Sequence, residues 1–188
     1  MKNYIKIILV SLLFINCKAQ TIVNINTYNL GDNSNKYFRD IDNNFQNFVG
    51  TWENTTGNTT FRVVLWKVEM APFTADINCF KDDILGKFMI IENANMPNED
   101  IIHNSVKYYP QNNLTSESVI YVDTGDGIVC RGLIEDNSGN MTFRGGLKIT
   151  ITNPGITPSV AHWEINTRVL LLGQSFTVPI DIMLTKIN

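Results

Sequence analysis

Residues 143–151, FRGGLKITI, decide the fold class. From Leu147 onward an apolar residue occupies every second position, again at Ile149 and Ile151, and polar residues lie between them. A period of two directs the apolar side chains to one face of a β-strand and the polar ones to the other. Strands with one buried and one solvated face are typical of antiparallel sheets.

The same alternation recurs toward the C-terminus, over residues 161–171 and 178–184. Clusters of turn-forming residues separate further strand-like runs along the chain. These runs are 51–55, 59–70, 85–93, 101–108, 117–123 and 127–135. Short strands joined in sequence predict an all-β fold, either an antiparallel up-and-down barrel of about 8–9 strands or, as the alternative, a β-sandwich.

One short helix is expected before the strands. Apolar residues recur at steps of three to four between Phe38 and Val49, which is the spacing of one helical face. Gly50 follows this run and is expected to end the helix. Helix and strands together predict a single β domain over residues 37–188.

Residues 1–16 have the features of a signal peptide. Lys2 and Lys6 give a positive start, and residues 7–15 are apolar apart from Ser11. This run is too short to cross a bilayer, which takes about 20 residues. We therefore predict that the segment is a signal peptide and that the protein is exported.

Two processing routes are open after the signal peptide. Residues 14–17, FINC, resemble a lipobox, in which cleavage exposes Cys17 and its thiol receives a diacylglycerol. This route predicts a lipoprotein of the periplasm or outer membrane, anchored through Cys17. Residues 17–36 are rich in asparagine and lack apolar periodicity, so they are expected to form a flexible tether. The alternative is cleavage after Ala19, which would give a soluble secreted protein.

Charge and cysteine content exclude several kinds of site. The formal net charge is −3 and the basic residues are scattered, which argues against binding to nucleic acid. Beyond Cys17, the chain has Cys79 and Cys130, which either form a disulfide in an oxidising compartment or stay as two buried thiols. With two histidines and no CxxC motif, no metal site and no cofactor are expected.

No catalytic residue is expected either. A serine or cysteine nucleophile needs a neighbouring base, which is usually histidine. His103 and His162 are the only candidates, and we expect both on the surface, His162 because it lies on the polar side of an alternating strand. The chain lacks a Gly-x-Ser-x-Gly motif. The sequence therefore predicts a protein that is not an enzyme.

Residues 45–53, FQNFVGTWE, place a short helical turn directly before a Gly-x-Trp strand. This arrangement resembles the opening of lipocalin-like (calycin) barrels. The resemblance implies that the helical turn plugs one barrel end and that Trp52 fills the barrel floor. It also implies that a basic residue near the C-terminus, Arg168 or Lys186, packs across the indole ring.

Four segments, 16–20, 40–43, 48–53 and 82–88, also resemble a group of small exported flavobacterial proteins with no assigned function. This resemblance extends over most of the chain beyond the signal peptide. It implies export and a β domain, and it carries no activity to transfer.

Two functions from different classes follow from this fold. The first is a non-catalytic binding module of the cell envelope that holds a small apolar ligand against wall aromatics such as Phe61 and Trp163. The second is a structural or protein-interaction domain with a solid core, which meets an unknown protein partner. Three glycines, Gly132, Gly145 and Gly146, either leave space in the barrel or mark bulges.

The lipid anchor predicts a change of cell fraction on substitution. Cys17→Ala removes the acceptor thiol, so the protein should move from the membrane fraction to the soluble fraction. Immunoblotting of fractionated cells measures this shift. An unchanged distribution would instead indicate cleavage after Ala19.

Overall fold

The protein is described here by a computed structural model, which covers residues 20–28, 31–73, 76–109, 114–138, 142–166 and 176–187. These residues form strands and two short 3-10 helices. The N-terminal elements are β1 (Thr21–Asn24), η1 (Ile25–Thr27), β2 (Lys36–Arg39) and η2 (Asn44–Asn47). The strands that follow are β3 (Gly50–Thr56), β4 (Thr59–Pro72), β5 (Phe80–Glu92), β6 (Asp100–Asn104), β7 (Lys107–Tyr109), β8 (Leu114–Ser116), β9 (Ile120–Gly125), β10 (Val129–Asp136), β11 (Phe143–Ile151), β12 (Val160–Asn166) and β13 (Asp181–Lys186).

Eight of these strands form a closed antiparallel barrel. Going around the barrel, the order is β3, β4, β5, β9, β10, β11, β12 and β13, and β13 then pairs with β3. Neighbouring strands follow one another in sequence, except that β6, β7 and β8 are inserted between β5 and β9. The prediction of an up-and-down barrel is therefore confirmed, and the sandwich alternative is not adopted.

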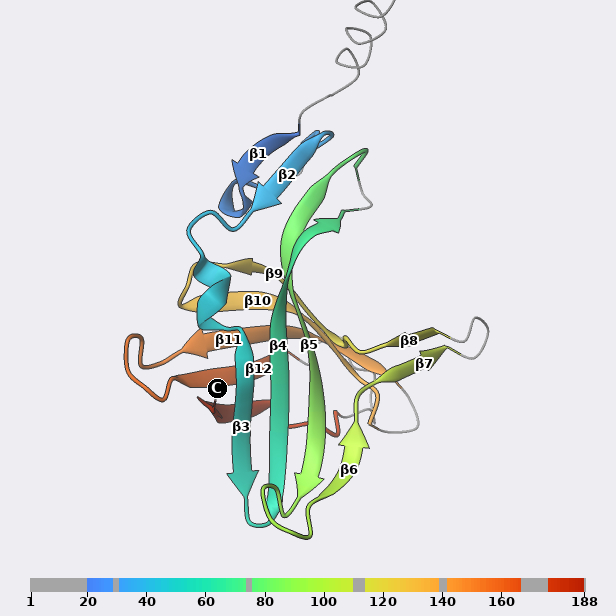
Figure 1. Ribbon diagram of the computed structural model, residues 1–188, viewed down its shortest axis with the longest axis vertical. Coiled ribbons are helices and arrows are strands. Elements are labelled where there is room, and N and C mark those ends of the chain that lie inside the picture. The colour runs from blue at the N-terminus through green and yellow to red at the C-terminus, as the bar shows by residue number, and fades with distance from the viewer. Residues whose placement is uncertain are drawn as a thin grey trace, which may run out of the picture.

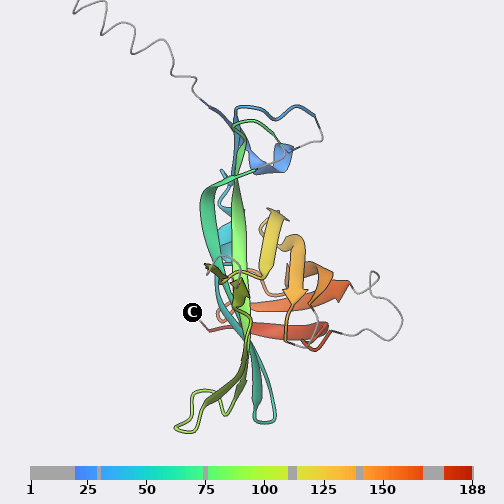
Figure 2. The same cartoon turned by 90° about the vertical axis from the view of Figure 1, so that its right-hand side faces the viewer.

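The barrel is flattened into two crossing layers. In Figure 1, β3, β4 and β5 run along the long axis of the molecule, and β9 to β12 cross them at a steep angle. In Figure 2 the layer of β3, β4 and β5 is seen edge-on, with β10, β11 and β12 on one side of it. The long strands β4 and β5 extend beyond the barrel at one end, where β1 and β2 lie beside them (Figure 1).

Alternation along β11 accounts for its place in the barrel wall. Leu147, Ile149 and Ile151 are buried and point inward, whereas Lys148 and Thr150 are partly exposed on the outside. A slip of one residue in the pairing of β11 with β10 or β12 would turn the apolar set outward. Burial of one face thus fixes the register of these strands.

The predicted helix is wrong in most of its length. Tyr37 and Phe38 lie in β2, and only Asn44–Asn47 form a 3-10 turn. Each face of β2 is covered: the Tyr37 hydroxyl bonds to the buried Asp82, and the Phe38 ring packs 5.2 Å from the Tyr28 ring. Phe38 and Phe45 are both buried although they belong to different elements, and Ile41 between them is 55% exposed, so the three-to-four spacing does not mark one helical face.

The predicted tether is also wrong over residues 20–28 and 31–36. Strand β1 pairs with β2 in parallel, and β2 pairs in parallel with β5. The side chain of Ile25 is buried in the core, and the Asn24 side chain caps η1 by accepting a hydrogen bond from the Asn26 amide. Cys17 and the predicted signal peptide lie outside the described residues. The helices in the described ranges are too short to span a membrane.

Cys79 and Cys130 are both buried and both free. The structure therefore has the two separate thiols, and the alternative of a disulfide is not formed. Cys79 precedes β5, with its carbonyl bonded to the amide of Phe73, whereas Cys130 lies in β10. Burial raises the pKa of both thiols, which keeps them protonated and unreactive.

Thiol counting checks this arrangement. Labelling of the denatured, unreduced mature protein should modify both Cys79 and Cys130, because nothing bridges them. Mass spectrometry counts the labels, and labelling of the folded protein serves as the control in which neither buried thiol reacts. A denatured protein that takes up no label would show that the two cysteines are bridged.

Candidate functional site: a hollow in the outer wall of the barrel

Side chains fill the interior of the barrel. The rings of Phe61 and Trp163 meet edge to face with centroids 5.7 Å apart, and the ring of Phe88 lies 5.8 Å from that of Phe61. Aromatic pairs at such distances are well packed. Three hollows formed by described residues, which lie across β10–β12, beside η1 and beside η2, are not lined by these rings. Phe61 and Trp163 are therefore core residues and not the wall of a ligand cavity.

Helix η2 closes one end of the barrel. Phe45 and Phe48 are fully buried there, and the indole Nε1 of Trp52 donates a hydrogen bond of 2.8 Å to the Phe48 carbonyl. The Nζ of Lys186 lies 5.4 Å from the centroid of the Trp52 ring and 3.3 Å from the Asn47 carbonyl oxygen. Of the two basic residues named from the sequence, Lys186 thus lies over Trp52. Arg168 is outside the described residues.

Asp136 fixes the chain at the end of β10. Its carboxylate accepts hydrogen bonds from the backbone amides of Thr177 and Val178 and from the Ser138 hydroxyl. Burial opposes ionisation of Asp136, but these hydrogen bonds outweigh it and hold its pKa below the ordinary value. The buried Val178 is thereby held against the core.

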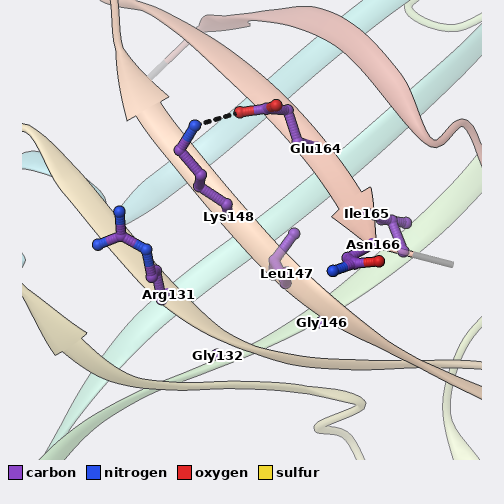
Figure 3. A pocket seen from close by; sticks show the side chains of 8 residues that line it. All are labelled: Arg131, Gly132, Gly146, Leu147, Lys148, Glu164, Ile165 and Asn166. Carbon is purple, nitrogen blue, oxygen red and sulfur yellow. Dashed lines mark hydrogen bonds and ion pairs between the residues drawn. The ribbon is translucent and has the colours of Figure 1, made fainter. Parts of the chain in front are cut away.

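A hollow lies in the outer wall of the barrel, across β10, β11 and β12 (Figure 3). Its volume is about 480 Å³, which lies in the range of small-molecule sites, roughly 300–1,000 Å³. The residues that line it are Arg131, Gly132, Gly146, Leu147, Lys148, Glu164, Ile165 and Asn166. The register places Arg131, Lys148 and Glu164 in one row across the three strands.

Gly146 is the residue that opens this hollow. A Cβ at Gly132 would collide with the Tyr121 carbonyl oxygen, and a Cβ at Gly145 would lie 2.6 Å from a side chain of β12. A Cβ at Gly146 would meet only the Asn166 Cβ, at an ordinary 3.6 Å. Close packing therefore requires glycine at the first two positions. At Gly146 a side chain has room, and its absence leaves the wall hollow.

Of the two cations around the hollow, Lys148 forms an ion pair and Arg131 forms none within the described residues. The Nζ of Lys148 lies 2.6 Å from the Glu164 carboxylate (Figure 3). Arg131 stands directly opposite Lys148 in the β10–β11 pair, and within the described part of the chain no hydrogen bond or ion pair reaches its guanidinium. Like charges directly opposite each other in a sheet are destabilising. The hollow thus holds two cations and one carboxylate, in a protein whose net charge is negative.

An apolar strip leads into the hollow from β9. Tyr121 is paired with Leu133, and Leu133 is paired with Gly146, so the three residues form a row across β9, β10 and β11. Leu133 is 52% exposed and Tyr121 37%, although both are large side chains. A cationic pair and an exposed apolar strip therefore lie side by side on the outer wall.

A second hollow lies between η1, β2 and β5. Its walls include Ile25, Tyr28, Phe38 and Phe73, and its volume is about 120 Å³. This is well below the range of about 300–1,000 Å³ for small-molecule sites. We therefore interpret it as a packing gap beneath the N-terminal strands.

Asp82 is the centre of a buried polar cluster that the sequence did not reveal. Its carboxylate accepts hydrogen bonds of 2.6 Å from the Tyr37 hydroxyl and 2.9 Å from the Asp40 amide. The Nζ of Lys67 lies 3.3 Å from Asp82 and 3.4 Å from Asp40. Burial opposes ionisation of Asp82, but these partners hold its pKa below the ordinary value. The cluster joins β2 to the barrel, and its carboxylates are already occupied by these partners.

Neither histidine has the partners of a catalytic base. The His103 Nε2 lies 3.3 Å from the Asn137 side-chain oxygen, and the His162 Nε2 lies 2.6 Å from Asp181. Within the described residues, neither ring is bonded to a hydroxyl or thiol group. The described ranges also contain no cluster of three or more histidine, cysteine, aspartate or glutamate residues that would hold a metal ion.

The sequence matches one family model, described as a family of unknown function, DUF6705, over residues 1–154. The chain belongs to the DUF6705 family. No curated protein and no solved structure matches it significantly. The family match runs from the N-terminus to the turn between β11 and β12, so it includes Arg131, Gly146 and Lys148. DUF6705 membership agrees with the expectation of an uncharacterised family.

The buried cluster predicts an acid-sensitive contribution to stability. The pKa of Asp82 is lower in the folded than in the unfolded chain, so its stabilising effect is complete above the unfolded pKa of about 3.9 and is lost as the pH falls through the folded pKa. Asp82→Asn should lower the free energy of unfolding at pH 7 by about 3 kcal/mol. Urea denaturation at pH 7 and in acid measures both effects.

The exposed Asp100 of β6 provides the control, because Asp100→Asn should leave stability almost unchanged. The difference between Asp82→Asn and the unsubstituted protein should shrink in acid. Equal stability of the two proteins at pH 7 would contradict a role for the cluster in holding β2.

Proposed function

We propose that this protein is a lipid-anchored, non-catalytic binding module of the cell envelope, and that its ligand binds in the hollow of the outer wall. One observation carries the proposal: Gly146 leaves the wall open beside two opposed cations, and within the described residues no hydrogen bond or ion pair reaches the guanidinium of Arg131. The resemblance to lipocalin-like barrels would place a ligand inside the barrel. Because core side chains occupy that interior, we place the ligand on the outer wall instead.

The composition of the hollow defines the class of ligand. An anionic group lying between Arg131 and Lys148 would relieve their repulsion and would gain charge-assisted hydrogen bonds from the guanidinium. An apolar part of the same molecule would cover the exposed strip of Leu133 and Tyr121. The expected ligand is therefore a small amphipathic anion, which keeps the apolar character predicted from the sequence and adds a charge.

The filled core also favours the second function, a protein-interaction domain. Strand β6 carries Ile101 and Ile102, which are both more than half exposed. An exposed apolar edge of this kind suits a protein partner. The two functions differ in whether a small molecule accompanies the purified protein.

Filling the hollow tests the binding module. The unsubstituted protein, purified gently from its host, should show one defined mass excess in native mass spectrometry that is lost on denaturation. Gly146→Leu should reduce the bound fraction about tenfold, because the side chain occupies the ligand volume. Stability should stay equal or rise by about 0.5–1 kcal/mol, since a glycine is removed from a strand interior.

Gly146→Ala is the matched control, because one methyl group fits at 3.6 Å from the Asn166 Cβ and leaves most of the hollow open. Its bound fraction should remain close to that of the unsubstituted protein. A bare mass for the unsubstituted protein would favour the protein-interaction domain.

A further inference from the structure

We infer that the end of the molecule formed by β1 and by residues 76–79, which precede β5, rests against the lipid bilayer, with Ile22 and Ile77 entering its interface. This inference rests on the proposed anchor at Cys17. It adds a second membrane contact, made by the folded domain, and it fixes which end of the domain faces the membrane.

Because β1 is a folded strand that begins at Thr21, only a short segment of chain lies between Cys17 and the domain. Only Lys18 and Ala19 separate Cys17 from Gln20, where the described chain begins. Three residue steps span at most about 11 Å, even when fully extended. A lipid on Cys17 would therefore hold Gln20 within about 11 Å of the lipid headgroups, whereas a flexible stretch of about twenty residues would have allowed on the order of 25 Å.

Hydrogen bonds place Ile77 next to the point where the chain enters the domain. The Gln20 side chain donates to the Asn78 carbonyl at 3.1 Å, and the amide of Asn35 donates to the Ile77 carbonyl at 2.9 Å. The amide of Thr21 in turn donates to the Asn35 carbonyl. In Figure 1 this region forms the end of the molecule opposite the β3–β4 turn and the β5–β6 connection.

Ile77 and Ile22 are unusually open to solvent for isoleucines. Ile77 is 75% exposed, more than any other large apolar side chain among the described residues, and Ile22 is 55% exposed. Single exposed apolar residues are ordinary on a protein surface. These two, however, lie at the end that the proposed anchor holds close to lipid, where burying them is favourable.

The charges nearby do not favour an electrostatic attachment. The two lysines of this region, Lys36 and Lys81, have acidic residues beside them: Asp32 and Asp76 near Lys36, and Asp83 at 2.9 Å from Lys81. Binding to anionic lipid depends on clusters of lysine and arginine, which this end does not have among its described residues. The contact we infer is therefore apolar and should not depend on salt. The anchor makes weak apolar contacts sufficient, because it keeps the local concentration of lipid high.

Site-specific fluorescence tests the contact in the full, lipid-modified protein. Ile77→Cys carries an environment-sensitive dye, and Met96→Cys in the β5–β6 connection is the control, because Met96 is 60% exposed at the opposite end. The native Cys79 and Cys130 are buried and do not react in the folded protein. Both proteins are reconstituted into phosphatidylcholine vesicles that contain brominated lipid. Ile22→Cys provides a second reporter position if Ile77→Cys does not fold.

The dye at position 77 should shift to the blue and lose about half of its emission to the brominated lipid, in low and high salt alike. The dye at position 96 should show neither change. Equal behaviour of the two positions, with diacylglycerol detected on Cys17 by mass spectrometry, would overturn the inference and leave the anchor intact. An unmodified Cys17 in a soluble protein would overturn the anchor itself, and with it this orientation.

Discussion

Closure of the barrel between β5 and β9 is the constraint on which the rest of the structure depends. Strand β5 pairs with β4 along one edge, and along the other it meets β2, β9 and β6 in turn. At the seam a Cβ on Gly86 would lie 2.5 Å from the Leu65 side chain and 2.9 Å from the Val64 carbonyl oxygen. The strands approach closely enough to seal the core because this position has no side chain. An open sheet would leave Ile84 and Ile120, now fully buried, in water.

The filled core restricts the binding that we propose to the outer surface of the barrel. Rings such as those of Phe61 and Trp163 use the interior for stability. The outward side chains of β10, β11 and β12 face solvent and do not have to pack the core. On these outer faces, a glycine within a strand at Gly146 and two cations opposite each other, Arg131 and Lys148, both lower the stability of the sheet. The polar cluster around Asp82 is different, since its groups are all paired and hold β2 in place.

The barrel was predictable from the sequence because alternation with a period of two is clear in β11, β12 and β13, and turn-forming residues separate the less regular strands before them. For Trp52 the resemblance left the basic partner open between Arg168 and Lys186, and only the structure places Lys186 over the ring. Strand β1 was not predictable, since its order comes from parallel pairing with β2 and from the burial of Ile25. The hollow was hidden for a similar reason. Gly145 and Gly146 are adjacent in sequence, and only the packing of their neighbours shows that one is crowded and the other open.

The pairing of β13 with β3 has a consequence for how the protein matures. These strands meet at Thr185 with Glu53 and at Lys186 with Trp52, close to the two ends of the described barrel sequence. A chain that leaves the ribosome or crosses a membrane does so from its N-terminus. The long sheet of β3, β4 and β5 can assemble early from sequential hairpins, but the ring stays open, with β3 as a bare edge, until Lys186 has emerged. A chain of this topology therefore needs its last strand before the edge of β3 is protected from pairing with other chains.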